Sequence, residues 1–197
     1  MEITSQRSGK KLELVNLSKF LSLVLRHRPE AVGIQLDPGG WVDIETLLEH
    51  CEKRGRVISR SLLEEVVQTN NKQRFAISED GIRIRASQGH SVPIELGYAR
   101  AVPPEVLYHG SVAERIKAIQ SQGLRKMKRH HVHLSPDAKT ARGVGSRRGA
   151  PIVLRIHAGQ MHRDVHVFYL SANHVWLTDR VPSEYINVVE GEAIHKK

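Results

Sequence analysis

The chain has 197 residues, with 30 lysines and arginines against 21 aspartates and glutamates, so its formal net charge at pH 7 is +9. A hydrophobic fraction of 40% excludes wholesale disorder, and no apolar run approaches the roughly 20 residues that a membrane-spanning helix needs. Because Cys51 is the only cysteine, an internal disulfide and a cysteine-based zinc site are excluded. The basic N-terminal segment lacks the apolar stretch of a secretory signal. We expect a soluble, cytoplasmic protein with no membrane partner.

The positive charge is concentrated in the second half of the chain. Residues 1–88 carry a net charge of +2, whereas residues 89–197 carry +7 and ten of the twelve histidines. Lysine and arginine release counterions when they bind phosphate, so this excess favours a polyanionic partner, nucleic acid first. A basic surface that serves only solubility is the alternative. With three Phe, four Tyr and two Trp, the composition argues against a single-strand binder built on stacked rings.

Apolar residues recur at helical spacing in three stretches of the first 90 residues, and these are 17–25, 44–51 and 62–67. Pro29 should end the first helix, because proline cannot continue the hydrogen-bond ladder. Asp43 is placed to cap the second helix. Ser61 and Glu64 have the spacing of a capping box for the third helix.

Short strands accompany these helices. The strand candidates of the first half are 41–43, 74–78 and 82–86. The last two are joined by residues 79–81, a plausible hairpin turn. Three helices with a hairpin wing predict a winged-helix domain at 1–90.

The second half has a different character. From Ser87 to Pro104 the chain brings polar residues, glycine and proline without a periodic apolar face, which predicts a linker at 91–104. In the domain expected at 105–197, Ser111 and Glu114 form a capping box for a helix that ends near Gly123. The strand candidates are 106–109, 131–134, 152–156, 165–170, 174–177 and 185–189. A mixed, mostly antiparallel α+β fold is expected.

Cationic residues suited to phosphate lie at two places in the first half. Arg26, His27 and Arg28 come together at a predicted helix end, where a favourable interaction with the helix dipole is the structural alternative. Arginine supplies a planar fork for phosphate oxygens, and histidine can move a proton near neutral pH. Arg85 ends a strand and leads into a donor-rich loop at 87–91, although a solvated wing arginine would look the same.

The second half offers two further places. His109, Gly110 and Ser111 join a strand to a capped helix, where glycine allows a ligand to approach and helix N–H groups can meet an anion. Alternation places His131 and His133 on one strand face. No carboxylate or cysteine falls at a metal-ligand spacing with them, so no metal is expected. The glycine-rich residues 143–149 match neither common nucleotide-binding loop.

Several separated motifs go further than composition. They are LSKFLSLVLRHRPE, GGWVDIETLL, NNKQRFAI, IRIRASQGHS, VLYHGS, HHVHLS and GSRRGAPIVL, and they run from residue 17 to about 155. In this order they resemble the RNA 2′-phosphotransferases of the KptA type. The resemblance implies a winged-helix domain followed by an NAD-binding domain of the ADP-ribosyltransferase fold.

The resemblance also implies a reaction and its participants. An internal 2′-monophosphate passes from RNA, with spliced tRNA as the best-known case, to NAD⁺, through an ADP-ribosylated 2′-phosphate. The products are RNA with a free 2′-hydroxyl, nicotinamide and ADP-ribose 1″,2″-cyclic phosphate. NAD⁺ is consumed as a co-substrate, and no metal is needed.

The family's motifs imply the catalytic residues. Arg26 and His27 match its Arg-His pair, and Arg85 matches the arginine of its RAxQGHS motif. Its last catalytic arginine falls on Arg147, with Arg148 as the alternative.

The same resemblance implies the binding residues. His109, Gly110 and Ser111 stand where the family has its NAD-binding HGT motif, and Ser135 is expected near the same pocket. Residues expected to contact the RNA substrate are Gln88, His90 and Arg148.

Two other functions stay open at this point. One is a winged-helix regulator that binds nucleic acid, although the third helix carries Glu64 and Glu65 and no basic residue between Ser61 and Asn70, poor equipment for reading a major groove. The other is an ADP-ribosyltransferase that stops after the first step.

Overall fold

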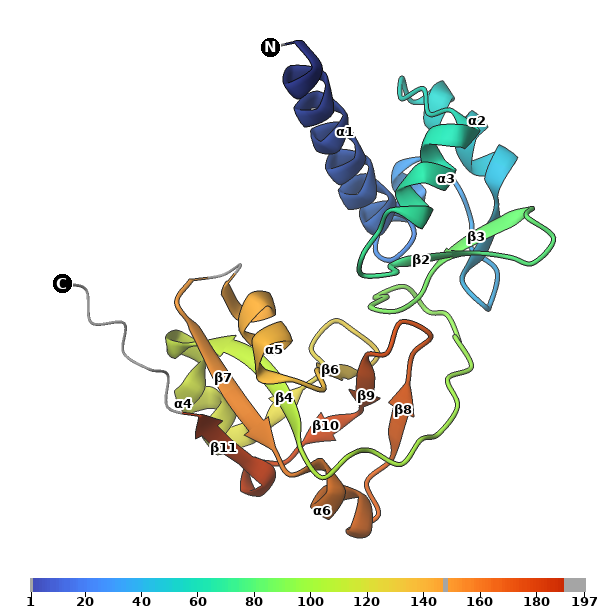
Figure 1. Cartoon of the computed structure of the whole chain (residues 1–197). Helices are drawn as coiled ribbons and strands as arrows, with labels where there is room; N and C mark the ends of the chain where they lie inside the picture. Colours follow the sequence, from blue (N-terminus) through green and yellow to red (C-terminus); the bar gives the residue numbers. More distant parts are fainter. Residues whose placement is uncertain (1, 147–148, 190–197) are drawn as a thin grey trace. The chain divides into compact units, whose positions relative to one another are not determined.

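Figure 1 shows the computed structural model of the chain, which describes residues 2–146 and 149–189, with side chains from residue 9 on. The chain divides into two compact units, residues 1–97 and 98–197. Both are built from helices and small antiparallel sheets, so the predicted α+β class is confirmed. In the described part of the chain, no helix is long and apolar enough to cross a bilayer.

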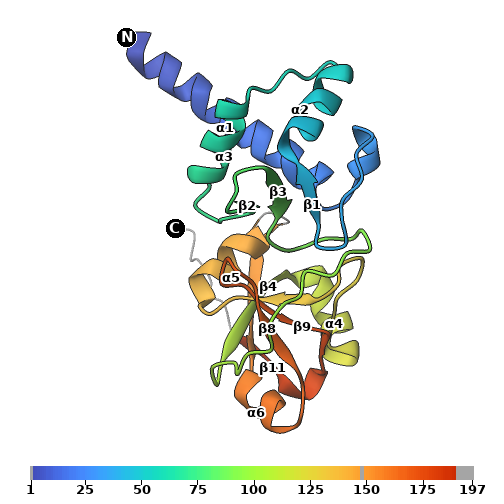
Figure 2. The same cartoon turned by 90° about the vertical axis from the view of Figure 1, so that its right-hand side faces the viewer.

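Unit 1 packs helices against one small sheet (Figure 2). Its elements are α1 (Glu2–Val24), the 3₁₀ helix η1 (Pro29–Ala31), β1 (Trp41–Asp43), α2 (Ile44–Lys53), α3 (Arg60–Gln68), β2 (Phe75–Ile77) and β3 (Arg83–Ala86). The strands are antiparallel in the order β1-β3-β2. The helices and strands predicted for this half are present with small shifts at their ends, except that α1 begins at Glu2, well before the predicted stretch 17–25.

The apolar faces of the three helices meet over the sheet. The buried residues of this core include Leu17, Leu21, Val24, Leu47, Leu63, Val66 and Phe75. Leu48 is partly buried and packs against them. Each fully buried side chain of this size contributes about 1.5–3 kcal/mol, so this core holds the unit together.

One of the two predicted helix caps in unit 1 is confirmed and the other is wrong. The Asp43 carboxylate accepts a hydrogen bond of 2.8 Å from the backbone N–H of Thr46, as expected. Helix α3, however, starts at Arg60, and its cap is Ser59, whose hydroxyl accepts from the Leu62 N–H at 3.2 Å. Ser61 lies within the first turn, and Glu64 pairs with Arg60 instead of closing a capping box.

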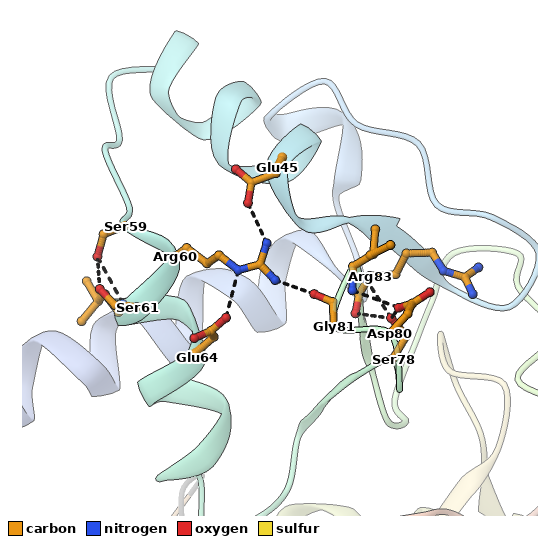
Figure 3. A network of polar contacts seen from close by, with 11 residues as sticks. Glu45, Ser59, Arg60, Ser61, Glu64, Ser78, Asp80, Gly81 and Arg83 are labelled. Carbon is orange, nitrogen blue, oxygen red and sulfur yellow. Dashed lines mark hydrogen bonds and ion pairs between the residues drawn. The ribbon is translucent and has the colours of Figure 1, made fainter.

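Arg60 joins three elements of unit 1 (Figure 3). Its guanidinium donates to Glu45 of α2 at 2.8 Å, to Glu64 of α3 at 2.9 Å and to the Gly81 carbonyl in the β2–β3 turn at 2.5 Å. The hydrogen bonds to both carboxylates raise the pKa of Arg60. The basic residue at the start of α3 therefore ties the wing to the helices.

Replacing Arg60 tests this link. We expect Arg60→Ala to lower the melting temperature, because three elements lose a shared donor, and raised salt should narrow the difference from the wild type. Lys53→Ala is the control, since Lys53 contacts only Glu49 of its own helix, at 3.7 Å. Thermal unfolding followed by circular dichroism measures both. Equal shifts for the two variants would contradict the proposed link.

Unit 2 contains three small antiparallel sheets in its described residues. Its helices are α4 (Ala113–Gln122), α5 (Ala138–Gly145), α6 (Ala158–Arg163) and the 3₁₀ helix η3 (Ser183–Tyr185). Its strands are β4 (Leu107–Val112), β5 (Leu124–Arg125), β6 (Val132–Leu134), β7 (Pro151–Ile156), β8 (Phe168–Leu170), β9 (Trp176–Thr178), β10 (Arg180–Val181) and β11 (Ile186–Val189). The sheet orders are β11-β7-β4, β6-β9-β8 and β10-β5. All six predicted strands are present, whereas α5 and α6 and the short β5 and β10 were not predicted.

The central strand β7 carries buried residues on both faces, although Arg155 is exposed. Leu154 belongs to a second core, separate from that of unit 1, which also holds Leu134, with Ile116 packed against it. Val153 is buried as well, and strand alternation places it on the opposite face. Of the four residues expected in the second core, Leu134 and Leu154 belong to it and Ile116 packs against it, whereas Val153 is buried outside it.

The segment expected as a linker, 91–104, is hydrogen-bonded along its length. The Ser91 and Glu95 N–H groups donate to the carbonyls of Arg26 and Pro38, both in unit 1. The Ala101 N–H donates to the Phe168 carbonyl of unit 2. Each end is thus fixed to its own unit.

Candidate functional site

The end of α1 is joined to the loop that follows β3. The Arg28 N–H closes the helix by donating to the Leu23 carbonyl at 2.9 Å, just before Pro29 begins η1. Nδ1 of His27 lies 3.0 Å from the Ser91 hydroxyl, and the Ser91 N–H donates to the Arg26 carbonyl at 2.9 Å. Two sequence motifs more than 60 residues apart therefore meet.

Arg85 lies directly opposite Trp41 in the β1–β3 ladder. Its guanidinium carbon is 4.4 Å from the centroid of the Trp41 ring, a cation–π contact. Nη1 donates to the Gly39 carbonyl at a long 3.4 Å, while Nε is buried without a hydrogen-bond partner. Within the described residues no carboxylate forms an ion pair with Arg85, so a half-buried positive charge lacks a counter-charge.

The loop after β3 is held in place by contacts within unit 1. The Ser87 hydroxyl donates to the Gln73 carbonyl at 2.9 Å, and Gly89 takes a positive φ of 87°, which glycine adopts without strain. His90 is only 1% exposed and lies against the backbone of Gly40. Of the two residues of this loop expected to contact the substrate, Gln88 is thus partly exposed and His90 is interior.

The His109 motif lies on the edge strand β4 of unit 2. Nδ1 of His109 lies 3.0 Å from the His133 carbonyl, so this ring nitrogen donates. Tyr108 and Ser135 exchange two backbone hydrogen bonds of 2.8 Å each. The strand segment that carries His109 therefore lies beside Ser135.

The predicted helix cap at Ser111 is wrong. Strand β4 continues to Val112, paired with β7, and Ser111 is a strand residue that is 7% exposed. Helix α4 begins only at Ala113 and has no side-chain cap. Ser111 therefore does not stand at the start of a helix, where unpaired N–H groups could bind an anion.

Gly110 makes room for a helix. A Cβ atom here would overlap the carbonyl oxygen of Ala141 and lie 2.8 Å from the backbone nitrogen of Gly145, both in α5. On the side where a Cβ would stand, the space is therefore occupied by α5 and not by a ligand. Helix α5 in turn ends at the glycine-rich segment containing Arg147 and Arg148, which lie outside the described residues.

The histidine-rich segment shows no metal site. In the part of the chain that the structure describes, no three His, Cys, Asp or Glu residues are grouped closely enough to hold an ion. His131 instead lies between the rings of Tyr98 and Tyr169, at 6.0 and 5.3 Å between centroids. Burial lowers the pKa of His131. The charge of Asp179 acts in the opposite direction and raises this pKa, whereas the charges of His130 and Lys126 lower it further.

Sequence reasoning missed two residues that contact the candidate set. Trp41 was assigned only to a strand, and its position over Arg85 follows from strand register. His133 was considered as a metal ligand, whereas its carbonyl orients His109. The predicted strands at 41–43 and 82–86 were the one signal that could have indicated the first contact.

Together, fold and site define a two-unit α+β protein with an arginine-containing site in one unit and a strand-borne histidine motif in the other. The chain belongs to the RNA 2′-phosphotransferase family, Tpt1 / KptA, whose family model matches residues 12–180.

Relatives match over nearly the whole chain. It is 54% identical over 171 residues to a probable RNA 2′-phosphotransferase of Flavobacterium johnsoniae, covering 87% of this chain and 94% of the relative. Proteins with the same description from Rhodopirellula baltica and Streptomyces coelicolor are 53% and 54% identical, covering 88% and 87% of this chain and 95% and 93% of their own lengths.

The packing of α5 on Gly110 predicts a sharp size limit. We expect Gly110→Ala to destabilise the protein by about 1–3 kcal/mol, the usual cost of overpacking, because the obstructing atoms are backbone. Gly143→Ala is the matched control, since nothing lies within 4 Å of a Cβ there and alanine favours the helix. Urea unfolding compares them. A Gly110→Ala variant as stable as the control would contradict the close packing.

His131 predicts a loss of stability in mild acid. Its pKa in the folded state is below the ordinary 6.5, so the unfolded chain takes up the proton first. The stability that neutral His131 contributes is therefore complete above about pH 6.5, and it is lost as the pH falls through the pKa of His131 in the folded state. His131→Phe should reduce this loss, whereas His162→Phe, at an exposed position, should keep it. Urea unfolding at several pH values between about 7 and 5 measures both. If the free energies of unfolding of wild type and His131→Phe fell in parallel with pH, His131 would not be the cause of the acid instability.

Proposed function

We propose that this protein is an NAD⁺-dependent RNA 2′-phosphotransferase with spliced tRNA as its natural substrate. In this proposal unit 1 is a winged-helix domain that binds the RNA, and unit 2 is an ADP-ribosyltransferase-like domain that binds NAD⁺. Family membership supports the 2′-phosphate chemistry.

The observation that carries the proposal is the half-buried guanidinium of Arg85. Its Nε has no acceptor, and no carboxylate of the described residues neutralises it. A buried cation without a counter-charge is costly, so the site is suited to an anion supplied by the substrate. A phosphate monoester presents oxygens at the spacing that an arginine fork can bind.

The first step asks for positioning. A 2′-phosphate oxygen bonds to the ribose carbon that carries nicotinamide, and nicotinamide leaves with the electron pair of the broken bond. A phosphate dianion is already nucleophilic, so holding it in line contributes more than a base would. Arg26 and Arg85 are the described residues that we assign to this task.

The second step asks for charge stabilisation and a proton. The ribose 2″-hydroxyl attacks phosphorus, the cyclic phosphate forms, and the RNA 2′-oxygen leaves and takes up a proton. Cations around the phosphoryl oxygens stabilise the developing charge. We assign the proton to His27, which is exposed and positioned by Ser91, and we keep Arg147 in the catalytic set, with Arg148 as its alternative.

The residues for NAD⁺ are divided by their burial. His109 and Ser135 are partly exposed and adjacent, so they fit direct contacts with the dinucleotide. Gly110 and Ser111 fit a supporting role, because α5 packs against Gly110 and the side chain of Ser111 is buried. When bound, NAD⁺ supplies the ribose carbon with its leaving group.

The products test the proposal directly. RNA with one internal 2′-phosphate, NAD⁺ and the protein should yield RNA with a free 2′-hydroxyl, nicotinamide and ADP-ribose cyclic phosphate in equal amounts. Added chelator should leave the yield unchanged. Unreacted RNA would contradict the proposal, and RNA that ends as a stable ADP-ribosylated phosphate would show an enzyme that stops after the first step.

The arginines should separate the two steps. We expect Arg85→Ala to lower turnover by about 100- to 1,000-fold, the usual loss when a transition-state donor is removed. In at least one of Arg26→Ala, Arg85→Ala and Arg147→Ala, RNA with ADP-ribose on its 2′-phosphate should accumulate. Gel analysis of labelled RNA detects this adduct.

Arg85→Lys is the informative companion, because it keeps the charge and loses the fork. It should also fail, whereas Arg83→Lys, on the same strand and paired with Asp37 at 3.6 Å, should turn over near the wild-type rate. Near-normal turnover in all three alanine variants would refute the assigned set.

A further inference from the structure

A dense group of positive charges lies on the surface of unit 2, and none of its members is among the residues assigned above. It consists of Arg125, Lys126, Lys128, Arg129 and Arg180, all exposed, and we name it the cationic surface. Three of its members, Lys126, Lys128 and Arg129, fall within the short connection from β5 to β6, and Arg125 and Arg180 lie on β5 and β10. Within the described residues, its ion pair joins Lys126 to Asp179 at 3.5 Å, with both side chains at least half exposed. Positive charge therefore strongly exceeds negative charge here.

The fold holds these charges together although the local strand pairing and turn conformation are unfavourable. Arg125 and Arg180 are direct partners in the β5–β10 ladder, and like charges opposite each other destabilise a strand pair. Met127 takes a φ of +55°, which is unusual for a residue other than glycine. The Arg129 N–H closes this turn by donating to the Lys126 carbonyl at 3.1 Å. A bound polyanion would relieve the repulsion that the free protein keeps.

An aromatic cluster adjoins the cationic surface. The His131 ring meets Tyr98 and Tyr169 edge to face, with interplanar angles of 69° and 61°, and all three side chains are partly exposed. Because its pKa is lowered, His131 is neutral at physiological pH and presents an uncharged ring. Surfaces that bind single-stranded nucleic acid combine cations for the backbone with rings for the bases. The chain has few aromatic residues, but the fold gathers two tyrosines and this histidine in one place.

The cationic surface is continuous with the His109 motif. Nη1 of Arg129 lies 3.5 Å from Nδ1 of His133, and the His133 carbonyl accepts from His109. His133 therefore links the His109 motif to Arg129 of this surface.

We propose that the cationic surface and the aromatic cluster of Tyr98, His131 and Tyr169 bind a single-stranded segment of the substrate RNA. The cations contact backbone phosphates, and the rings stack on bases. The inference rests on the proposed function, since it assigns the RNA strand that carries the 2′-phosphate, and it gives unit 2 a contact with RNA as well as with NAD⁺.

Salt dependence of RNA binding tests the cations. The triple variant Arg125→Ala, Lys128→Ala, Arg180→Ala removes three of them, and Arg115→Ala, Lys117→Ala, Arg142→Ala, on α4 and α5, is a control with the same change in net charge. Binding of a labelled single-stranded RNA with an internal 2′-phosphate is measured by anisotropy at several salt concentrations, without NAD⁺. The slope of log affinity against log salt should become shallower by about 2, at roughly 0.7 per phosphate contact, in the first variant only.

The aromatic cluster is tested with Tyr169. We expect Tyr169→Ala to weaken RNA binding by roughly 5- to 150-fold, the range for loss of a base-stacking ring, and Tyr169→Phe to restore it because the ring returns. Thermal unfolding of both variants shows whether the fold is kept, and the phenylalanine variant supports stacking only if its RNA affinity recovers.

The KM for NAD⁺ separates this inference from the assignment of the His109 motif. It should be unchanged in the Arg125, Lys128, Arg180 variant. A raised KM for NAD⁺ with unchanged RNA affinity would overturn the inference, because the surface would then serve the dinucleotide. Equal salt slopes in the variant and its control would overturn it too. Because RNA binding is measured without NAD⁺, a wild-type protein that binds RNA but yields no products would contradict the proposed function alone.

Discussion

The site of unit 1 depends on the contact between the Arg85 guanidinium and the Trp41 ring. A guanidinium carries its donors in its own plane, so a stack on its face fixes that plane and leaves donors at its edge for a ligand. The stack follows from strand register, because a slip of one residue would send Arg85 to the other face of the sheet. Asp37 secures the register by accepting from the Trp41 N–H at 2.8 Å, while its ion pair is with Arg83. The Asp37 carboxylate thus holds the turn before β1, and its ion pair is with Arg83 and not with Arg85.

Much of the fold follows from local pattern, and the errors arise where distant residues decide. The apolar spacing and the Asp43 cap were predicted correctly, because each depends on neighbours within one or two turns. The cap at Ser111 was wrong, because pairing with β7 extends β4 beyond the glycine that reads as its end. Helix α5 was missed because Gly143 and Gly145 look like loop residues. Gly145 lets the helix approach β4 closely, because a Cβ there would lie 3.0 Å from the Ser111 carbonyl oxygen, whereas Gly143 faces open space.

The candidate site divides in the same way. Arg26, His27 and Arg85 were identified from motifs, and the structure adds the contacts that fix their positions, such as the one between His27 and Ser91. Trp41 could not be identified as a partner of Arg85 without the strand register. The aromatic cluster could not be anticipated either, because its rings come from three distant parts of the chain. Residue chemistry is thus visible in the sequence, whereas juxtaposition across sheets is not.

The central claim is that Arg85 binds the 2′-phosphate of the substrate through donors that the Trp41 stack leaves available. Nitrogen-15 NMR of arginine-labelled protein observes its Nε–H directly, with the signal assigned by its absence from Arg85→Lys. We predict that RNA with an internal 2′-phosphate shifts this resonance and slows its exchange with water, because Nε gains an acceptor, and that the same RNA with a free 2′-hydroxyl leaves it in place. An unchanged resonance at saturating phosphorylated RNA would contradict the account.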